Sequence, residues 1–208
     1  MKFLAILLIV SFPHQSWAVV CNYTLDPQSV QVNWTAFKTT QKLPVGGTFK
    51  TVSLKNESLK KNKGKRSLHD LLSGIDAQIP VKEVSAISTG NPARDQTLFD
   101  HFFNRFKNPT EIHGKIIEIM GSDSEGSLNL EVRLNDKSVK VPLKYTRTTD
   151  GHFEAKGELD ILGFGLKSAF EELHHNCETL HKGPDGVSKT WSSVDLKLNA
   201  NVLKKCDS

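Results

Sequence analysis

The chain has 208 residues, 38% of them hydrophobic, and carries a formal net charge of +4. This length is enough for one domain with a sizeable core, and no Pro/Gly/Ser-rich linker or internal repeat divides it. The mild positive charge gives no reason to infer nucleic-acid binding.

The first 18 residues have the pattern of a secretory signal peptide. Lys2 precedes an apolar run from Phe3 to Val10, and the polar stretch that follows ends at Ala18. Small residues at the cleavage positions fit such a signal, so we expect a mature domain over residues 19–208 that is periplasmic or secreted. Val20 precedes Cys21, where a lipoprotein signal needs a small residue, so we expect no lipid anchor. No other apolar run approaches the roughly 20 residues that span a bilayer.

Three strands are predicted before residue 90. Val30, Val32 and Trp34 alternate with polar residues, which is typical of a strand with one buried face. The stretch Thr48 to Leu54 is strand-like with a broken period, which a β-bulge would explain. Ala77 to Ser88 is the third strand.

A basic stretch lies between the second and third of these strands. Leu54 to Arg66 contains six Lys or Arg residues among polar neighbours. We interpret it as a solvated loop, and transient contact with anionic lipid head groups at a membrane surface is the alternative. Ser67 to Leu72 then predicts a helical turn.

An aromatic helix is predicted from Asn91 to Phe106. Asn91 can cap its start and Pro92 suits its first position. Large apolar residues recur at three- and four-residue offsets and form one apolar face of the helix. They are Leu98, Phe99, Phe102, Phe103 and Phe106.

The rest of the chain carries the clearest strand signal. Leu128 to Leu134 and Val139 to Tyr145 alternate apolar with polar residues, and Asn135-Asp136 between them supplies turn chemistry for a hairpin. Phe153 to Ile161 and Val194 to Val202 repeat the alternation. Ile112 to Met120 is strand-like with a second broken period, and a short helix is expected over Leu166 to Leu173, after the turn at 162–165.

These patterns predict a mainly β fold of about eight antiparallel strands. Strands with one solvent-exposed face belong to antiparallel sheets with a single buried face, as in a barrel or a sandwich. A barrel of eight strands can be packed solid or can hold one small ligand, and the strand pattern leaves both open.

Motifs for catalysis and metal binding were also sought. The sequence has no G-x-S-x-G elbow, HExxH or P-loop pattern, so we expect no enzyme activity and no cofactor. His174, His175, Cys177 and His181 lie close in sequence, and imidazole with thiolate is a plausible zinc set. Their spacing matches no standard zinc finger, and a metal-binding protein using the His174 to His181 cluster stays an alternative.

The order of several motifs resembles the YceI-like family of secreted bacterial proteins. The resemblance rests on Leu25-Asp26-Pro27 before the first strand, Gly47-Thr48-Phe49, and the succession of Ser85 to Thr89, Arg94-Asp95 and Phe102-Phe103. It implies an eight-stranded, lipocalin-like antiparallel barrel with short helices at its ends that holds a polyisoprenoid lipid.

The sequence also departs from that family's pattern. Gln28 stands where many members have His, and Ala36-Phe37-Lys38 replaces a second His. The turn Leu134 to Ser138 lacks the family's glycine. These differences leave the identity of the ligand open.

We therefore expect a carrier that binds a long apolar lipid, either a polyisoprenoid or an isoprenoid quinone, with oligomeric state undetermined. A structural or interaction module with a fully packed barrel is the alternative. Arg94 is the candidate for a head-group contact. Nine large residues on apolar faces are the candidates for the ligand site: Trp34, Phe37, Phe102, Phe103, Phe106, Leu130, Leu143, Phe153 and Phe164.

The three cysteines predict one disulfide and one free thiol in an oxidising compartment. In an up-and-down barrel the last strand closes against the first, which brings Cys21 beside Cys206. Cys177 falls at the opposite end of the barrel. Because a disulfide needs Cα atoms within about 7 Å, we expect the Cys21–Cys206 bridge and a free Cys177.

Overall fold

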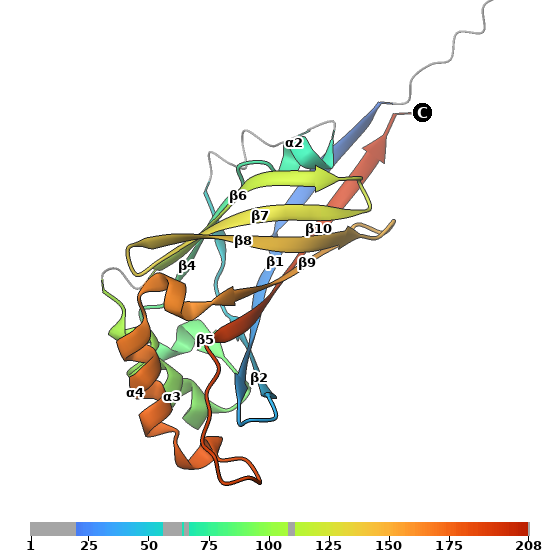
Figure 1. Ribbon diagram of the computed structural model, residues 1–208. Coiled ribbons are helices and arrows are strands. Elements are labelled where there is room, and N and C mark those ends of the chain that lie inside the picture. The colour runs from blue at the N-terminus through green and yellow to red at the C-terminus, as the bar shows by residue number, and fades with distance from the viewer. Residues whose placement is uncertain (1–19, 56–63, 65–66, 108–110, 208) are drawn as a thin grey trace, which may run out of the picture.

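The computed structural model describes residues 20–55, 64, 67–107 and 111–207. The expected signal peptide and most of the basic stretch Leu54 to Arg66 lie outside the described residues. In the part of the chain that the structure describes, ten antiparallel strands form one sheet in the order β3-β4-β6-β7-β8-β9-β10-β1-β2-β5, and the sheet curls into a half-barrel (Figure 1). None of the helices that the structure describes is long and apolar enough to cross a membrane.

The two longest strands lie side by side along the whole molecule. They are β1 (Cys21–Lys38) and β10 (Ser193–Cys206), whose register begins at Cys21 opposite Cys206. The expected closure of the last strand against the first is therefore confirmed.

From β10 the sheet continues into a meander. It contains β6 (Glu111–Gly121), β7 (Glu125–Leu134), β8 (Lys137–Arg147) and β9 (His152–Asp160). The β7–β8 turn has Asn135 and Asp136 at φ values of 52° and 61°, which is the turn chemistry that tight hairpins require. In β6 the register shifts between Ile116 and Glu118, so the bulge expected there is confirmed.

The strand count differs from the expected eight because two predicted strands are interrupted. Thr48 to Leu54 divides into the end of β2 (Leu43–Phe49) and β3 (Ser53–Leu54), and Ala77 to Ser88 divides into β4 (Asp76–Pro80) and β5 (Ile87–Ser88). Between β4 and β5 the chain forms a 3-10 turn instead of a ladder. Pro80 ends β4 because proline has no N–H to donate to the sheet.

These interrupted strands also curl the sheet. β2 pairs with β5 and β3 pairs with β4, so the segment 43–54 contacts the segment 76–88 on both sides of the break. The N–H of Lys50 donates to the carbonyl of Ala86 at 2.9 Å within the interruption. The two segments that contain the ends of the strand order, β3 and β5, therefore lie side by side.

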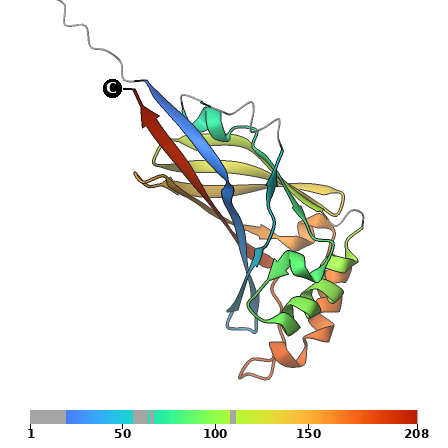
Figure 2. The same ribbon diagram turned by 180° about the vertical axis from the view of Figure 1, so that it is seen from behind.

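Within the described residues, three α-helices accompany the sheet. α2 (Leu68–Leu72) lies near the chain termini, whereas α3 (Pro92–His101) and α4 (Lys167–Asn176) pack together at the other end (Figures 1 and 2). Glu172 of α4 joins them, because it contacts His101 Nδ1 at 3.2 Å and Arg105 at 2.6 Å.

The predicted aromatic helix ends earlier than expected, at His101, and the chain continues as a 3-10 turn over Phe103–Arg105.

Candidate ligand-binding site

The half-barrel encloses an apolar cavity of about 220 Å³. Side chains from β1, β6, β7 and β10 form its walls, and the segment after α3 lines part of it. The polar side chains in the wall that the structure describes are those of His113, Thr190 and Asn199. Six of the nine expected ligand contacts belong to this wall: Trp34, Phe102, Phe103, Phe106, Leu130 and Phe153.

A cluster of aromatic rings follows α3 and borders the cavity. The ring centres of Phe102, Phe103 and Phe106 lie 5.2 to 5.6 Å apart in edge-to-face arrangements. The ring centre of Phe49, in β2, lies 6.1 Å from that of Phe103, so this pair joins the cluster to the sheet. Such pairs add stabilisation beyond their buried area and fix the orientation of the rings.

The start of α3 is fixed by side-chain hydrogen bonds. Asn91 accepts from the N–H of Arg94 at 3.1 Å, and Asp95 accepts from the N–H and hydroxyl of Thr89 at 2.8 and 2.6 Å. Asp95 therefore ties the helix to the end of β5 and so positions the aromatic cluster. The side chain of Arg94 is exposed and lies outside the cavity wall.

Trp34 forms part of the β1 wall. A Cβ atom on Gly47 would lie 2.1 Å from Trp34 Cζ2, so the absence of a side chain at Gly47 gives the indole its space. The indole Nε1 is buried and has no hydrogen-bond partner among the described residues. An oxygen atom at the cavity wall could therefore accept a hydrogen bond from this N–H group.

Three predicted contacts lie outside the cavity wall. Phe37 is an odd number of residues from Trp34 and so lies on the other face of β1, where Lys42 Nζ is 5.5 Å from its ring centre. Leu143 and Phe164 are fully buried in the core without bordering the cavity.

Trp191 also borders the cavity, although no sequence pattern pointed to it. It precedes β10 in a segment without apolar periodicity, so no strand or helix pattern marks it. Its position depends on pairing with the end of β1, where its N–H donates to the Phe37 carbonyl at 3.1 Å and its Nε1 donates to the Thr39 carbonyl at 2.8 Å.

The histidine cluster is organised around a hydroxyl. The Nδ1 atoms of His174 and His181 lie 2.8 and 2.7 Å from Thr190 Oγ1. Burial, the charge of Lys38 and the ring of His174 lower the pKa of His181 from 6.5 to about 4. Among the described residues, no three His, Cys, Asp or Glu side chains are placed to hold a metal ion, so the geometry does not support the zinc alternative.

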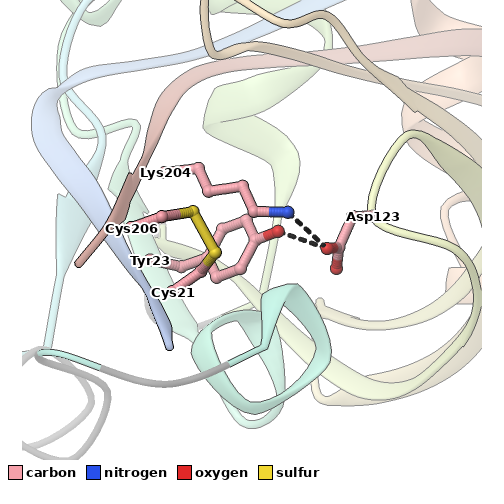
Figure 3. The surroundings of a disulfide bond; sticks show 5 residues. All are labelled: Cys21, Tyr23, Asp123, Lys204 and Cys206. Carbon is pink, nitrogen blue, oxygen red and sulfur yellow. Dashed lines mark hydrogen bonds and ion pairs between the residues drawn. A yellow bond between two sulfur atoms is a disulfide. The ribbon is translucent and has the colours of Figure 1, made fainter. Parts of the chain in front are cut away.

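At the opposite end of the half-barrel, a disulfide joins Cys21 to Cys206 (Figure 3). This confirms the expected pairing, and Cys177 is free and buried, where burial raises the pKa of its thiol. Tyr23 and Lys204 both donate to Asp123 beside the bridge (Figure 3). Burial opposes ionisation of Asp123, but these hydrogen bonds outweigh it and hold the pKa of the carboxyl below its ordinary value.

The fold and cavity define a class of protein in which an antiparallel half-barrel encloses an apolar space. The family model described as the YceI-like domain matches residues 23–201, so the chain belongs to the YceI-like family. No curated protein sequence matched the chain.

Two solved structures share the fold at low sequence identity. One is a polyisoprenoid-binding domain from Saccharophagus degradans implicated in plant cell wall breakdown, at 12% identity and a TM-score of 0.55, covering 86% of this chain and 97% of that one. The other is BcnA of Burkholderia cenocepacia, at 13% identity and a TM-score of 0.52, covering 86% of this chain and 99% of that one.

Proposed function

We propose that this protein is a carrier outside the cytoplasm that binds the hydrocarbon chain of a polyisoprenoid lipid, or of an isoprenoid quinone, in the half-barrel. The apolar cavity is the observation that carries this proposal. The polyisoprenoid binding named for the Saccharophagus domain of the same fold supports it.

The energetics of such binding follow from the composition of the wall. Burial of each methylene contributes about 0.8 kcal/mol, so one five-carbon prenyl unit offers a few kcal/mol before the cost of ordering the chain. His113 and Thr190 already have protein partners, since His113 contacts Glu111 at 3.3 Å and Thr190 contacts two histidines. Asn199 and the unpaired Trp34 Nε1 are the remaining polar groups in an otherwise apolar wall of the described residues. We therefore propose that selectivity depends on chain length and cross-section more than on polar recognition, and that the protein performs no chemistry on its ligand.

The size of the cavity sets a limit on the ligand. Ligand pockets commonly measure about 300 to 1,000 Å³, and this cavity at about 220 Å³ is smaller. A long polyprenyl chain must therefore extend beyond the cavity or displace side chains of its wall. Affinity is expected to rise with each added prenyl unit until the cavity is filled, and then to level off.

Export is part of the proposal. The bridge between Cys21 and Cys206 supports an oxidising compartment, because structural disulfides rarely persist in a reducing cytosol. The signal-peptide pattern of residues 1–18 supports the same location.

Extraction of the purified protein with organic solvent, followed by mass spectrometry, tests the proposal. We expect about one isoprenoid-type lipid per protein, or uptake of added polyprenols by the emptied protein with affinity that grows with chain length. An empty extract together with no uptake would refute the carrier function and favour the packed interaction module.

A further inference from the structure

The end of the half-barrel that carries α3 and α4 has a second surface, outside the cavity. It is formed by residues 38–43, which include the β1–β2 turn, and by residues 178–191. These two segments lie side by side in both views (Figures 1 and 2). The N–H of Thr39 donates to the Lys189 carbonyl at 2.8 Å, and the Thr40 hydroxyl donates to Asp185 at 2.6 Å. These bonds hold the two segments together as one surface.

This surface exposes large aliphatic side chains. Leu180 is 70% exposed, Leu43 is 52% exposed and Val187 is 51% exposed. They are the three most exposed large hydrophobic residues in the described part of the chain, and all three lie on these two segments. Exposed apolar side chains that gather in one region are a common feature of interaction surfaces.

The same two segments also carry lysine side chains. Lys42 Nζ and Lys189 Nζ lie 4.5 and 4.4 Å from the ring centre of Trp191, and neither forms an ion pair with a described carboxylate. Lys38 Nζ donates to the Leu180 carbonyl at 3.3 Å.

The surface also contains two acidic residues. Glu178 and Asp185 stand against four lysines in residues 38–43 and 178–191. Asp185 is engaged locally, because Val187 N–H and the Thr40 hydroxyl both donate to it. The positive charge therefore remains in excess.

We propose that this end of the molecule docks on the surface of a bilayer containing anionic phospholipid. The docking face consists of Lys38, Lys42, Leu43, Leu180, Val187 and Lys189. Protruding aliphatic side chains enter the region of the head groups while ammonium groups bind the phosphates. A bilayer accepts separate protruding side chains without a shaped counterpart, whereas a protein partner packs against its interface with close shape complementarity.

The docking face adjoins the cavity through Trp191. Its ring contacts both lysines of the face, and the same residue belongs to the cavity wall. Docking at this end would therefore bring the cavity wall next to the bilayer. The inference goes beyond the proposed function, because docking does not require that the cavity hold a lipid.

Sedimentation with vesicles tests the proposal on the mature protein, residues 19–208. The vesicles are phosphatidylcholine alone or phosphatidylcholine with about one third phosphatidylglycerol. We expect binding to the anionic vesicles that weakens with added salt. The double variant Lys42→Glu, Lys189→Glu should lower the partition coefficient about tenfold or more, and Leu180→Ser with Val187→Ser should also lower it.

Matched variants elsewhere on the surface control for net charge and hydrophobicity. Lys144→Glu with Lys205→Glu makes the same change of charge, and Met120→Ser with Leu203→Ser removes exposed apolar side chains. Circular dichroism identifies any variant that fails to fold. If either the aliphatic or the charge variant fails to fold, the other one still tests the proposal. The proposal is overturned if the wild type ignores anionic vesicles or if the control pairs weaken binding equally. It is also overturned if only neutralisation of Lys60, Lys61 and Lys63 abolishes binding.

Discussion

Gly47 gives the Trp34 indole its position in the cavity wall, and its substitution tests that packing. A Cβ atom at residue 47 would lie 2.1 Å from the ring, whereas one at Gly46 has the Trp34 carbonyl oxygen as its nearest neighbour at 3.9 Å. We expect Gly47→Ala to lower the free energy of unfolding by about 1–3 kcal/mol, because the ring must shift. Gly46→Ala is the matched control. Equal urea midpoints for the two variants would show that the indole is not confined.

Protonation of His181 is expected to lower the free energy of unfolding at acidic pH. Its pKa is about 4 in the folded protein and 6.5 ordinarily, so the folded state favours the neutral ring. The stabilisation is complete above about pH 6.5 and is lost as the pH falls towards 4, because the unfolded chain binds the proton more readily. His181→Gln should flatten the dependence of unfolding free energy on pH in this range. His175→Gln, on an exposed ring of α4, is the control, and an unchanged slope in His181→Gln would contradict the assignment.

The face of a strand on which a side chain lies could be predicted where apolar and polar residues alternate along that strand. Trp34, Leu130 and Phe153 lie on the predicted faces and border the cavity. Phe37 was assigned to the ligand site by size, although its parity relative to Trp34 places it on the other face. Trp191 could not be found, because hydrogen bonds to a segment about 150 residues earlier in the chain place it (Trp191 Nε1 to the Thr39 carbonyl, 2.8 Å).

At the scale of elements, the aromatic segment after α3 should behave as a cavity wall. A buried phenylalanine in a packed core loses about 3–5 kcal/mol on replacement by alanine. Phe164 is fully buried outside the cavity wall, so Phe164→Ala should show a loss in that range. Phe102→Ala should lose less, because its ring already borders empty space, and it should shift the preferred ligand towards bulkier or longer chains.

Thermal or urea unfolding of both variants, with mass spectrometry of their ligands, checks this difference. Equal losses of stability with an unchanged ligand would show that Phe102 is ordinary core.

The hairpins and helices were predictable because their signals are local. The alternation over residues 128–145, the Asn-Asp turn and the Asn91 cap each determine structure within a few residues. The interruptions of Thr48 to Leu54 and Ala77 to Ser88 depend on how these two segments meet across the sheet. Pro80 was a local sign of the break in the second segment, whereas the first segment has no such mark at its own break.

At the scale of the whole molecule, the disulfide joins the start of β1 to the end of β10. It links residues separated by 185 positions, for which the chain-entropy model gives a stabilisation of about 5 kcal/mol. Replacement of Cys21 and Cys206 together by serine should lower the free energy of unfolding by up to this amount. Cys177→Ala is the control for loss of a buried thiol. An unchanged denaturant midpoint in the double variant would indicate that the β1–β10 ladder alone holds the ends.

The central claim is that the cavity binds a lipid chain, and native mass spectrometry of the emptied protein with one added polyprenol tests it most directly. Ala200 lines the cavity, so Ala200→Trp should occupy much of its roughly 220 Å³, whereas Asn201→Trp adds the same side chain at an exposed position. We expect a one-to-one complex with the wild type and with Asn201→Trp, and loss of the complex with Ala200→Trp. No complex with the wild type, or equal binding by all three proteins, would contradict the claim.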